Sequence, residues 1–347
     1  MRRFLGFLRQ ERMYILLLIF VLLMTAVVMM PGEDRARSAN AEKSERQRQE
    51  LFVKEQEVRE ILDTNRDLAI IVGMVSLLFL LLICLGLVVD AMLIFSKLVG
   101  NRLEISTFRP RMIRWGLWDV CRVVILFLFF GYIILIIEAS LSRIFPLLKD
   151  DNFRMILNSS ILDILAVFFI FYFTVGQYKE KISSLGLSLK NFSRNVFYGL
   201  VGYIAIIPVL VGLLVVIAFI SNLLKYVPEK QAVVELFLKE ESAPFLVYTS
   251  LFAAIAGPVV EELFFRGFMY NAVKKYIGIF GATLISAATF AALHAHAVGF
   301  FPILALGMLL AYLYEKTGTL VSSITVHMIH NLSMVGMVFL VKQMGVY

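Results

Sequence analysis

The chain has 347 residues, of which 60 % are hydrophobic, and its mean hydropathy is +0.84. Soluble domains are typically about 45–50 % apolar, and repeated apolar runs of roughly 20 residues indicate membrane-spanning helices. We therefore expect an all-α polytopic membrane protein, integral to the cytoplasmic membrane. The 33 Lys and Arg residues exceed the 26 Asp and Glu residues by 7. No soluble basic domain carries this charge, which argues against nucleic acid as a partner.

The first apolar run extends from Tyr14 to Met30 and follows an arginine-rich segment, residues 1–13. Ala39-Asn40-Ala41 resembles a signal-peptidase cleavage site, but it lies far beyond the end of this run. We therefore expect a retained first helix. Because Lys and Arg are enriched on the inner side of membranes, we expect a cytoplasmic N-terminus.

A polar insert, residues 31–67, follows the first span and is dense in charges of both signs. Leu51, Val58 and Leu62 fall near one face of a helix, so we expect helical structure on the extracytoplasmic side. A solvated helical hairpin that extends the first two spans is one interpretation. A docking surface for another protein is the other.

About nine membrane spans are expected, and the basic loops between them alternate as cytoplasmic loops should. The expected spans are residues 14–30, 68–95, 117–137, 155–175, 196–224, 245–269, 280–298, 301–314 and 320–341. The chain then divides into an N-terminal extension, residues 1–116, and a body, residues 117–347. Two cysteines, Cys84 and Cys121, lie in apolar runs outside any CxxC pattern, so we expect buried thiols and neither a disulfide nor a thiolate metal site.

The acids of the sixth span are the first sign of chemistry, because ionisable groups at bilayer depth are costly. Glu262 and Arg266 are four residues apart on one helix face, which predicts a salt bridge. Glu261 points about 100° away and is left without that partner, so it suits a general base. Gly257 and Pro258 lie just upstream, where they can loosen the helix and admit water.

All four histidines of the chain lie in the last three spans. His327 and Asn331 are four residues apart and project toward one point, at a depth similar to that of His294. His330 lies about 60° round the helix from His327, and His296 about 200° from His294, so His296 is expected to face elsewhere. One such group alone is more often structural, but their coincidence on neighbouring helices predicts a shared polar site.

The residue types of this site fit amide hydrolysis. A carboxylate base with two imidazoles can activate a water molecule and stabilise an oxyanion. The same Glu/His/His set suits zinc, with water at an open position. The sequence has no Ser-His or Cys-His arrangement of comparable quality and no HExxH motif.

At these positions the sequence resembles the CAAX protease and bacteriocin-processing (CPBP, Abi) family of intramembrane endopeptidases. The family's patterns EExxxR, FxxxH and HxxxN stand here at Glu261 to Arg266, Phe290 to His294 and His327 to Asn331. The resemblance covers about residues 117–341. It implies that the last seven spans adopt the CAAX prenyl endopeptidase fold, and it leaves the role of the extension open.

The resemblance also implies roles for single residues. Glu261 would activate the water, aided by His294, and Glu262 with Arg266 would be the supporting pair. The remaining two motif residues, His327 and Asn331, would form the oxyanion hole or help to hold the water.

The oxyanion role explains Asn331, whereas a zinc site does not. We therefore prefer a glutamate mechanism that requires no cofactor, with zinc as the alternative. The expected partner is a membrane-associated peptide or protein substrate. A competing hypothesis is a non-catalytic membrane scaffold or immunity-type protein that binds a partner through residues 31–67. A transporter is disfavoured because no internal repeat is visible.

Overall fold

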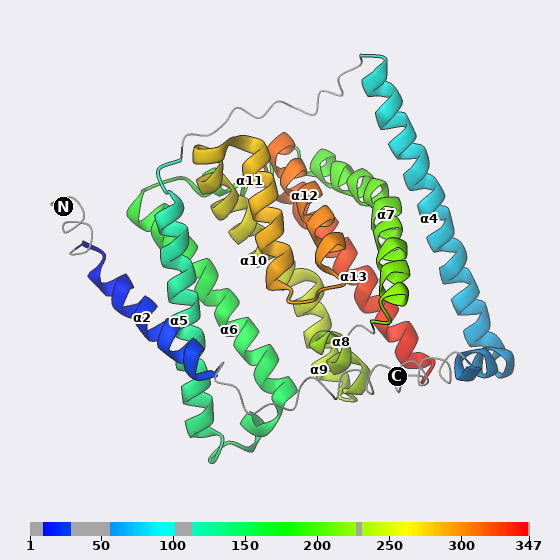
Figure 1. Ribbon diagram of the computed structural model, residues 1–347, viewed down its shortest axis with the longest axis horizontal. Coiled ribbons are helices and arrows are strands. Elements are labelled where there is room, and N and C mark those ends of the chain that lie inside the picture. The colour runs from blue at the N-terminus through cyan, green and yellow to red at the C-terminus, as the bar shows by residue number, and fades with distance from the viewer. Residues whose placement is uncertain (1–9, 29–55, 101–112, 227–230, 346–347) are drawn as a thin grey trace.

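The computed structural model describes residues 10–28, 56–100, 113–226 and 231–345, and nearly all of these are helical (Figure 1). Three segments, η2, η4 and η5, have the wider π-helical hydrogen-bond register. The elements in chain order are α2 (Arg12–Val28), α4 (Arg66–Leu98), α5 (Leu117–Leu141), η1 (Pro146–Lys149), α6 (Asp151–Phe171), η2 (Tyr172–Gln177), η3 (Ile182–Leu185), α7 (Phe192–Leu223), α8 (Ala232–Lys239), α9 (Ala243–Leu251), η4 (Phe252–Ala256), α10 (Gly257–Glu262), η5 (Leu263–Tyr270), α11 (Asn271–Leu293), α12 (Phe300–Thr317) and α13 (Val321–Gln343).

The predicted class, an all-α multi-pass membrane protein, is confirmed. Within the described ranges, seven helices are long and apolar enough to cross a membrane, and an eighth apolar stretch, Arg12–Ala26, is shorter. The longest of the seven, Ala243–Leu293, takes in both the sixth and the seventh expected spans. The two meet at Gly278, whose φ of 70° and ψ of −173° turn the chain back into the bundle.

The seventh expected span, residues 280–298, needs a correction at its end. α11 stops at Leu293, the next residues form a loop, and Ala295 has a φ of 48°. The helical angle that separated His296 from His294 therefore does not apply. His296 instead caps the turn, because its Nδ1 accepts a hydrogen bond of 3.0 Å from the backbone N–H of Gly299.

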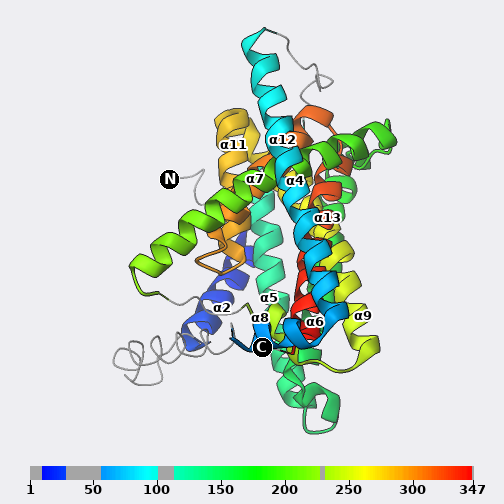
Figure 2. The ribbon, with the colours of Figure 1, turned by 90° about the vertical axis from the view of Figure 1, so that its right-hand side faces the viewer.

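The two helices of the extension lie on opposite flanks of the body (Figures 1 and 2). α2 packs against α5, whereas α4 packs against α7. Most of the polar insert lies outside the described residues, although residues 56–64 are helical. Trp115 packs into the main core, where its Nε1 donates 3.0 Å to the carbonyl of Phe268. The division at residue 116 stays a prediction.

A buried ion cluster fastens the N-terminal helix to the body. Arg122 of α5 bonds to the carboxylate of Glu11 and, at 2.8 Å, to that of Asp119. The hydroxyl of Tyr178 also donates to Asp119, at 2.9 Å. Burial opposes the charged form of Glu11, but hydrogen bonds from Arg122 and Trp118 and the charge of Arg122 hold the pKa of this carboxyl below its ordinary value.

The contact between α4 and α7 depends on one glycine. Leu68 and Gly86 are the buried residues of α4, and most of its other side chains are exposed. A Cβ atom on Gly86 would lie 2.5 Å from the carbonyl oxygen of Ile204 and 2.6 Å from Cδ of Pro208. Small residues allow such close approach of membrane helices. Gly86 therefore sets how closely α4 can approach α7.

The expected burial of the two cysteines is wrong. Cys84 and Cys121 are free thiols, and both are exposed on the protein surface. In a membrane protein an apolar residue need not be buried, because lipid tails are as apolar as a protein core. Their position in an apolar run could not distinguish the two environments.

The α4–α7 contact can be tested with a matched pair of substitutions. Gly86→Leu should displace α4, and overpacking of this kind typically costs about 1–3 kcal/mol. The thermal midpoint of the purified protein in detergent should fall. Gly73→Leu is the control, because nothing lies within 4 Å of a Cβ atom at Gly73 on the same helix. Equal midpoints for the two variants would contradict the contact.

Candidate active site

The centre of the candidate site is an ion pair with no access to water. Glu262 ends α10, Arg266 follows in η5, and both side chains are 0 % exposed. Nη1 of Arg266 donates 2.7 Å to Oε1 of Glu262, which is the predicted salt bridge. Nη2 of Arg266 donates 3.2 Å to the carbonyl of Gly307 on α12. A side chain at position 307 would crowd both Ala287 and this guanidinium.

The aromatic ring of Phe290 covers the guanidinium. The carbon Cζ of Arg266 lies 4.6 Å from the centre of this ring and 5.7 Å from that of Phe265. Cation–π contact of this kind is stronger where water is excluded. Phe290 also contacts both motif histidines, with ring centres 4.7 Å from His294 and 5.4 Å from His327. One ring thus joins the three sequence motifs.

Carbonyl groups of the π-helical segment η5 accept hydrogen bonds from side chains. Side chains from three other positions donate to them. Ser286 donates to the carbonyl of Phe265, Asn271 to that of Gly267, and Trp115 to that of Phe268. π-helical segments are rare and occur frequently at functional sites. These bonds fix the helix that carries the acids, and the sequence analysis did not foresee them.

His327 of α13 lies between the two acids. Its Nδ1 is 3.1 Å from Oε1 of Glu262, and because a buried carboxylate beside arginine only accepts, Nδ1 donates. Its Nε2 is 3.5 Å from Oε2 of Glu261. The imidazole is 2 % exposed, so both contacts are screened from water. With Nδ1 fixed by Glu262, the Nε2 edge faces the other acid and can share a proton with it.

Glu261 has the opposite environment to its neighbour. Its side chain is 37 % exposed, whereas that of Glu262 is fully buried. Nε2 of His327 is its polar neighbour, and Oε2 is a buried atom without a hydrogen-bond donor among the described residues. The predicted contrast between a paired acid and an open one is therefore observed. The open acid is where water can be bound.

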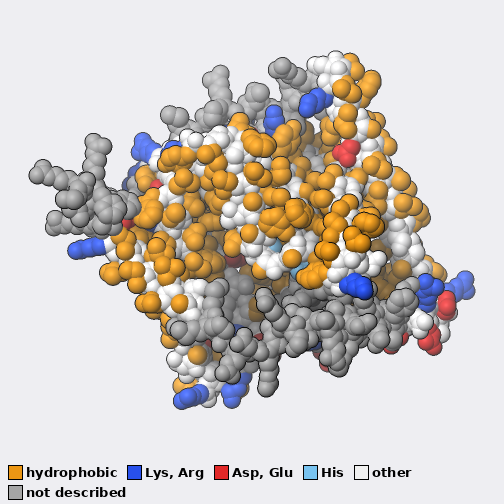
Figure 3. Space-filling view, in the orientation of Figure 1, with side chains coloured by type: hydrophobic (Ala, Val, Ile, Leu, Met, Phe, Trp, Pro, Cys, Tyr) orange, Lys and Arg blue, Asp and Glu red, His pale blue; other side chains and the backbone are white. Residues whose placement is uncertain are grey.

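His294 ends α11 at the rim of the site. Its Nδ1 is held 2.8 Å from the carbonyl of Phe290, and its side chain is exposed. This bond leaves Nε2 available toward water or a ligand. No contact joins His294 to Glu261 among the described atoms. Histidine side chains are visible near the middle of the view, among mainly hydrophobic side chains (Figure 3).

Asn331 bonds to a backbone carbonyl that lacks its helical hydrogen-bond donor. Gly257 donates its N–H to the carbonyl of Phe252, five residues earlier. In this register the carbonyl of Ala253 would pair with residue 258, but Pro258 has no N–H. The side-chain amide of Asn331 donates to that carbonyl instead, at 2.8 Å. The proline upstream of the acids and the asparagine of the third motif are thus parts of one feature.

The remaining histidine points away from the acids. The ring of His330 packs against Tyr203 of α7, with centres 6.2 Å apart. It lies within electrostatic range of His327 and His294. His330 therefore borders the site without contacting either glutamate.

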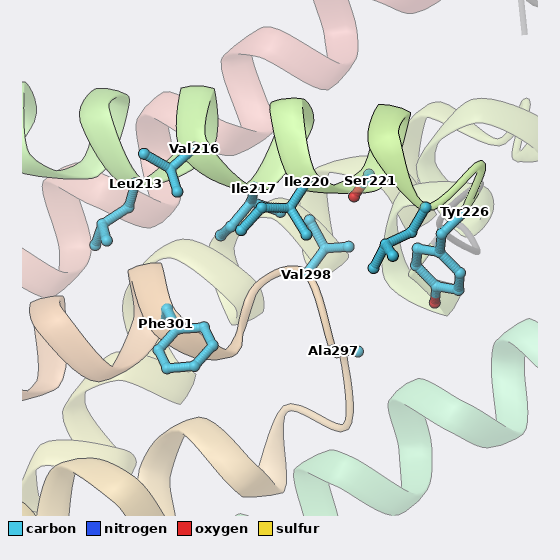
Figure 4. A pocket seen from close by; sticks show the side chains of 10 residues that line it. Leu213, Val216, Ile217, Ile220, Ser221, Tyr226, Ala297, Val298 and Phe301 are labelled. Atoms are coloured by element: carbon cyan, nitrogen blue, oxygen red, sulfur yellow. The ribbon is translucent and has the colours of Figure 1, made fainter.

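An apolar cavity of about 340 Å³ lies beside the loop that follows His294 (Figure 4). Its two walls are the C-terminal half of α7 and residues 297–301. Leu213, Ile217 and Ile220 line one wall, and Val298 and Phe301 the other. An apolar segment beside the loop could be held there.

One acid near the site was missed from the sequence. Asp163 of α6 lies within electrostatic range of Glu261. The signal was present, because a lone acid in an apolar span is unusual. It has no partner at helical spacing and no motif, so only the packing of α6 against α10 places it near the site.

The zinc alternative requires donor side chains that converge on one point. No three His, Cys, Asp or Glu side chains converge as metal ligands within the ranges that the structure describes. The expected Glu/His/His ligands, as arranged here, do not form a zinc site.

Comparison with known proteins shows what the part of the chain that carries the site is similar to. Residues 243–333 match the family described as type II CAAX prenyl endopeptidase Rce1-like. The chain is also 30 % identical over 91 residues to a protein of Bacillus subtilis (strain 168) named "Putative membrane peptidase YdiL". That match covers 26 % of this chain and 36 % of the length of the relative. No solved structure matches the chain. The predicted resemblance is confirmed over residues 243–333, which contain all three motifs.

The supporting pair can be tested by single and double substitution. Arg266→Met leaves Glu262 buried without its charge partner, a loss that typically costs about 3–5 kcal/mol. The double variant Glu262→Gln with Arg266→Met removes both charges and should recover a large part of that loss. Thermal unfolding in detergent measures both. A double variant that is no more stable than Arg266→Met would contradict this role of the pair.

The link between Asn331 and the proline predicts a compensation. Asn331→Ala leaves the carbonyl of Ala253 without a donor, and membrane hydrogen bonds are worth roughly 0.6–1.7 kcal/mol. Pro258→Ala returns an N–H at the position that this carbonyl needs. In a double-mutant cycle, Asn331→Ala should therefore cost less in the Pro258→Ala background than in the wild type. Equal costs in the two backgrounds would show that the proline and the asparagine are independent.

Proposed function

We propose that this protein is an intramembrane endopeptidase that hydrolyses a peptide bond of a membrane-associated peptide or protein. The observation that carries the proposal is the position of Glu261. It is an open carboxylate at the edge of a buried, charge-compensated cluster made by Glu262, Arg266 and His327. The match of residues 243–333 to a peptidase family supports the same reading.

Glu261 takes the role of general base. A water molecule bound at its carboxylate loses a proton to it and attacks the carbonyl carbon of the peptide. General bases of this kind typically contribute about 10²–10⁴-fold to the rate. His294 assists through Nε2, because its Nδ1 is engaged with the carbonyl of Phe290. Glu262 and Arg266 support the base by fixing His327 beside it.

His327 and Asn331 provide the donors for the oxyanion. Because Nδ1–H of His327 is given to Glu262, Nε2 donates when the ring is an imidazolium, and this edge faces Glu261. The amide of Asn331 uses one N–H on Ala253, and an amide carries two. Donors held in place before the reaction stabilise the developing charge without reorganisation. The substrate class beyond a membrane-associated peptide or protein is left to experiment.

The proposed mechanism uses no metal and no cofactor. We place the protein in the cytoplasmic membrane with its N-terminus inside, supported by the arginines before the first helix. The lipid bilayer supplies the apolar surroundings that raise the strength of each polar contact at the site. An extracytoplasmic partner that binds residues 31–67 is the competing function, and it needs no intact Glu261.

The test compares wild type with Glu261→Gln in native membranes, with new protein termini identified by terminal-labelling proteomics. Termini that are present in the wild type should be lost or reduced by about 10²-fold or more in the variant. Glu138→Gln is the control, because Glu138 is a buried membrane acid of α5 that bonds to Asn158, outside the site.

A wild-type sample treated with a chelator forms the third arm. Cleavage that persists under chelation supports the glutamate mechanism, whereas its loss together with recovery on added zinc would overturn it. Identical termini in wild type and Glu261→Gln would overturn peptidase function and favour the scaffold hypothesis. Deletion of residues 31–67 should then abolish partner binding.

A further inference from the structure

Asp163 is a membrane acid without a partner. It lies within α6, in the apolar sequence SSILDILAVFF, and its side chain is half-buried. It forms neither an ion pair nor a hydrogen bond with the described part of the chain. A carboxylate in this setting is costly, so an acid that is kept there without compensation requires an explanation.

Three other acids of the membrane segments are buried and compensated. Asp119 bonds to Arg122, Glu138 to Asn158, and Glu262 to Arg266. The absence of any such partner distinguishes Asp163 from these structural acids. An acid with no donor beside it favours its protonated form and keeps a proton to give.

The neighbour of Asp163 is Glu261. α6 packs against both α10 and η5, and the two carboxyl groups lie within electrostatic range of each other across this contact. The packing of α6 against the helix that carries Glu261 thus places a second carboxyl group near the proposed base. Two acids with different environments and different protonation are a common acid/base arrangement in hydrolases.

The two motif imidazoles are held by other groups. Both ring nitrogens of His327 face glutamates, at 3.1 and 3.5 Å. His294 is held at Nδ1 by the carbonyl of Phe290. Glu261 thus lies 3.5 Å from one imidazole and within electrostatic range of the carboxyl group of Asp163. Hydrolysis needs a base for the water and an acid for the leaving amine, and Asp163 is a carboxyl group near the base that has no partner of its own in the described part of the chain.

We propose that Asp163 is the general acid that protonates the leaving amine, an inference that rests on the proposed peptidase function. Glu261 takes one proton from water, and the hydroxyl oxygen bonds to the carbonyl carbon of the peptide. The C–N bond then breaks, and the amine nitrogen takes the proton of Asp163. Glu261 passes its proton to Asp163, which restores both groups. The products are one carboxylic acid and one amine.

The test varies the leaving group. A peptide substrate identified by terminal proteomics is compared with an ester of the same acyl sequence, whose alkoxide or phenoxide leaves without prior protonation. Asp163→Asn should lower kcat for the peptide by about 10²–10⁴-fold with KM nearly unchanged. Ester hydrolysis should stay within a few-fold of wild type, and it shows directly that the variant is folded. Asp163→Glu should recover part of the peptide activity.

Two controls separate this inference from the proposed function. Asp90→Asn makes the same chemical change at another acid in a membrane helix, on α4, and should leave both activities unchanged. Glu261→Gln should lose both activities. Equal losses on peptide and ester in Asp163→Asn, or no loss on either, would overturn the role of Asp163. Full peptide activity in Glu261→Gln would instead overturn the peptidase mechanism itself.

Discussion

The buried pair of Glu262 and Arg266 is the interaction on which the site depends. Two charges with no exposed surface are costly, and their mutual attraction offsets that cost only when further hydrogen bonds complete the set. Here the carbonyl of Gly307, the ring of Phe290 and the Nδ1 of His327 supply most of that set, and Oε2 of Glu262 and Nε of Arg266 have no hydrogen-bond partner among the described residues. These groups come from three different helices. Satisfying one ion pair therefore fixes α11, α12 and α13 around α10.

The same arrangement produces the chemistry of the neighbouring acid. Glu262 is paired with the charge of Arg266 and with the Nδ1 edge of His327. The Nε2 edge of His327 faces Glu261. Glu261 is half-exposed and has no arginine of its own, so it can bind water at bilayer depth. One carboxylate builds the site and the adjacent one is left to react. The adjacent positions on a helix, about 100° apart, are sufficient to separate the two roles.

The sequence predictions that the structure supports rest on the spacing of residues that are close together along the chain. The i,i+4 relation predicted the Glu262–Arg266 bond, and apolar run lengths predicted the spans within a few residues.

Features that depend on packing could not be predicted from the sequence. The π-helical segments, the loop after Leu293 and the contact of Asn331 with Ala253 arise from backbone register and from neighbours distant in sequence. Asp163 was missed because no motif contains it. The two cysteines were wrongly predicted to be buried, because an apolar sequence suits contact with lipid as well as burial in a protein core. The catalytic roles of Glu261, His294, His327 and Asn331 stay predictions.

Water access to Glu261 is the measurement that tests this account most directly. In a background with Cys84 and Cys121 replaced by serine, single cysteines at positions 261 and 286 are treated with a membrane-impermeant, water-soluble thiol reagent, with both faces of the membrane accessible. Glu261→Cys should react, because this side chain is 37 % exposed, whereas Ser286→Cys should be protected at 0 % exposure. Protection of position 261 equal to that of position 286 would mean that no water reaches the proposed base, and it would contradict the account.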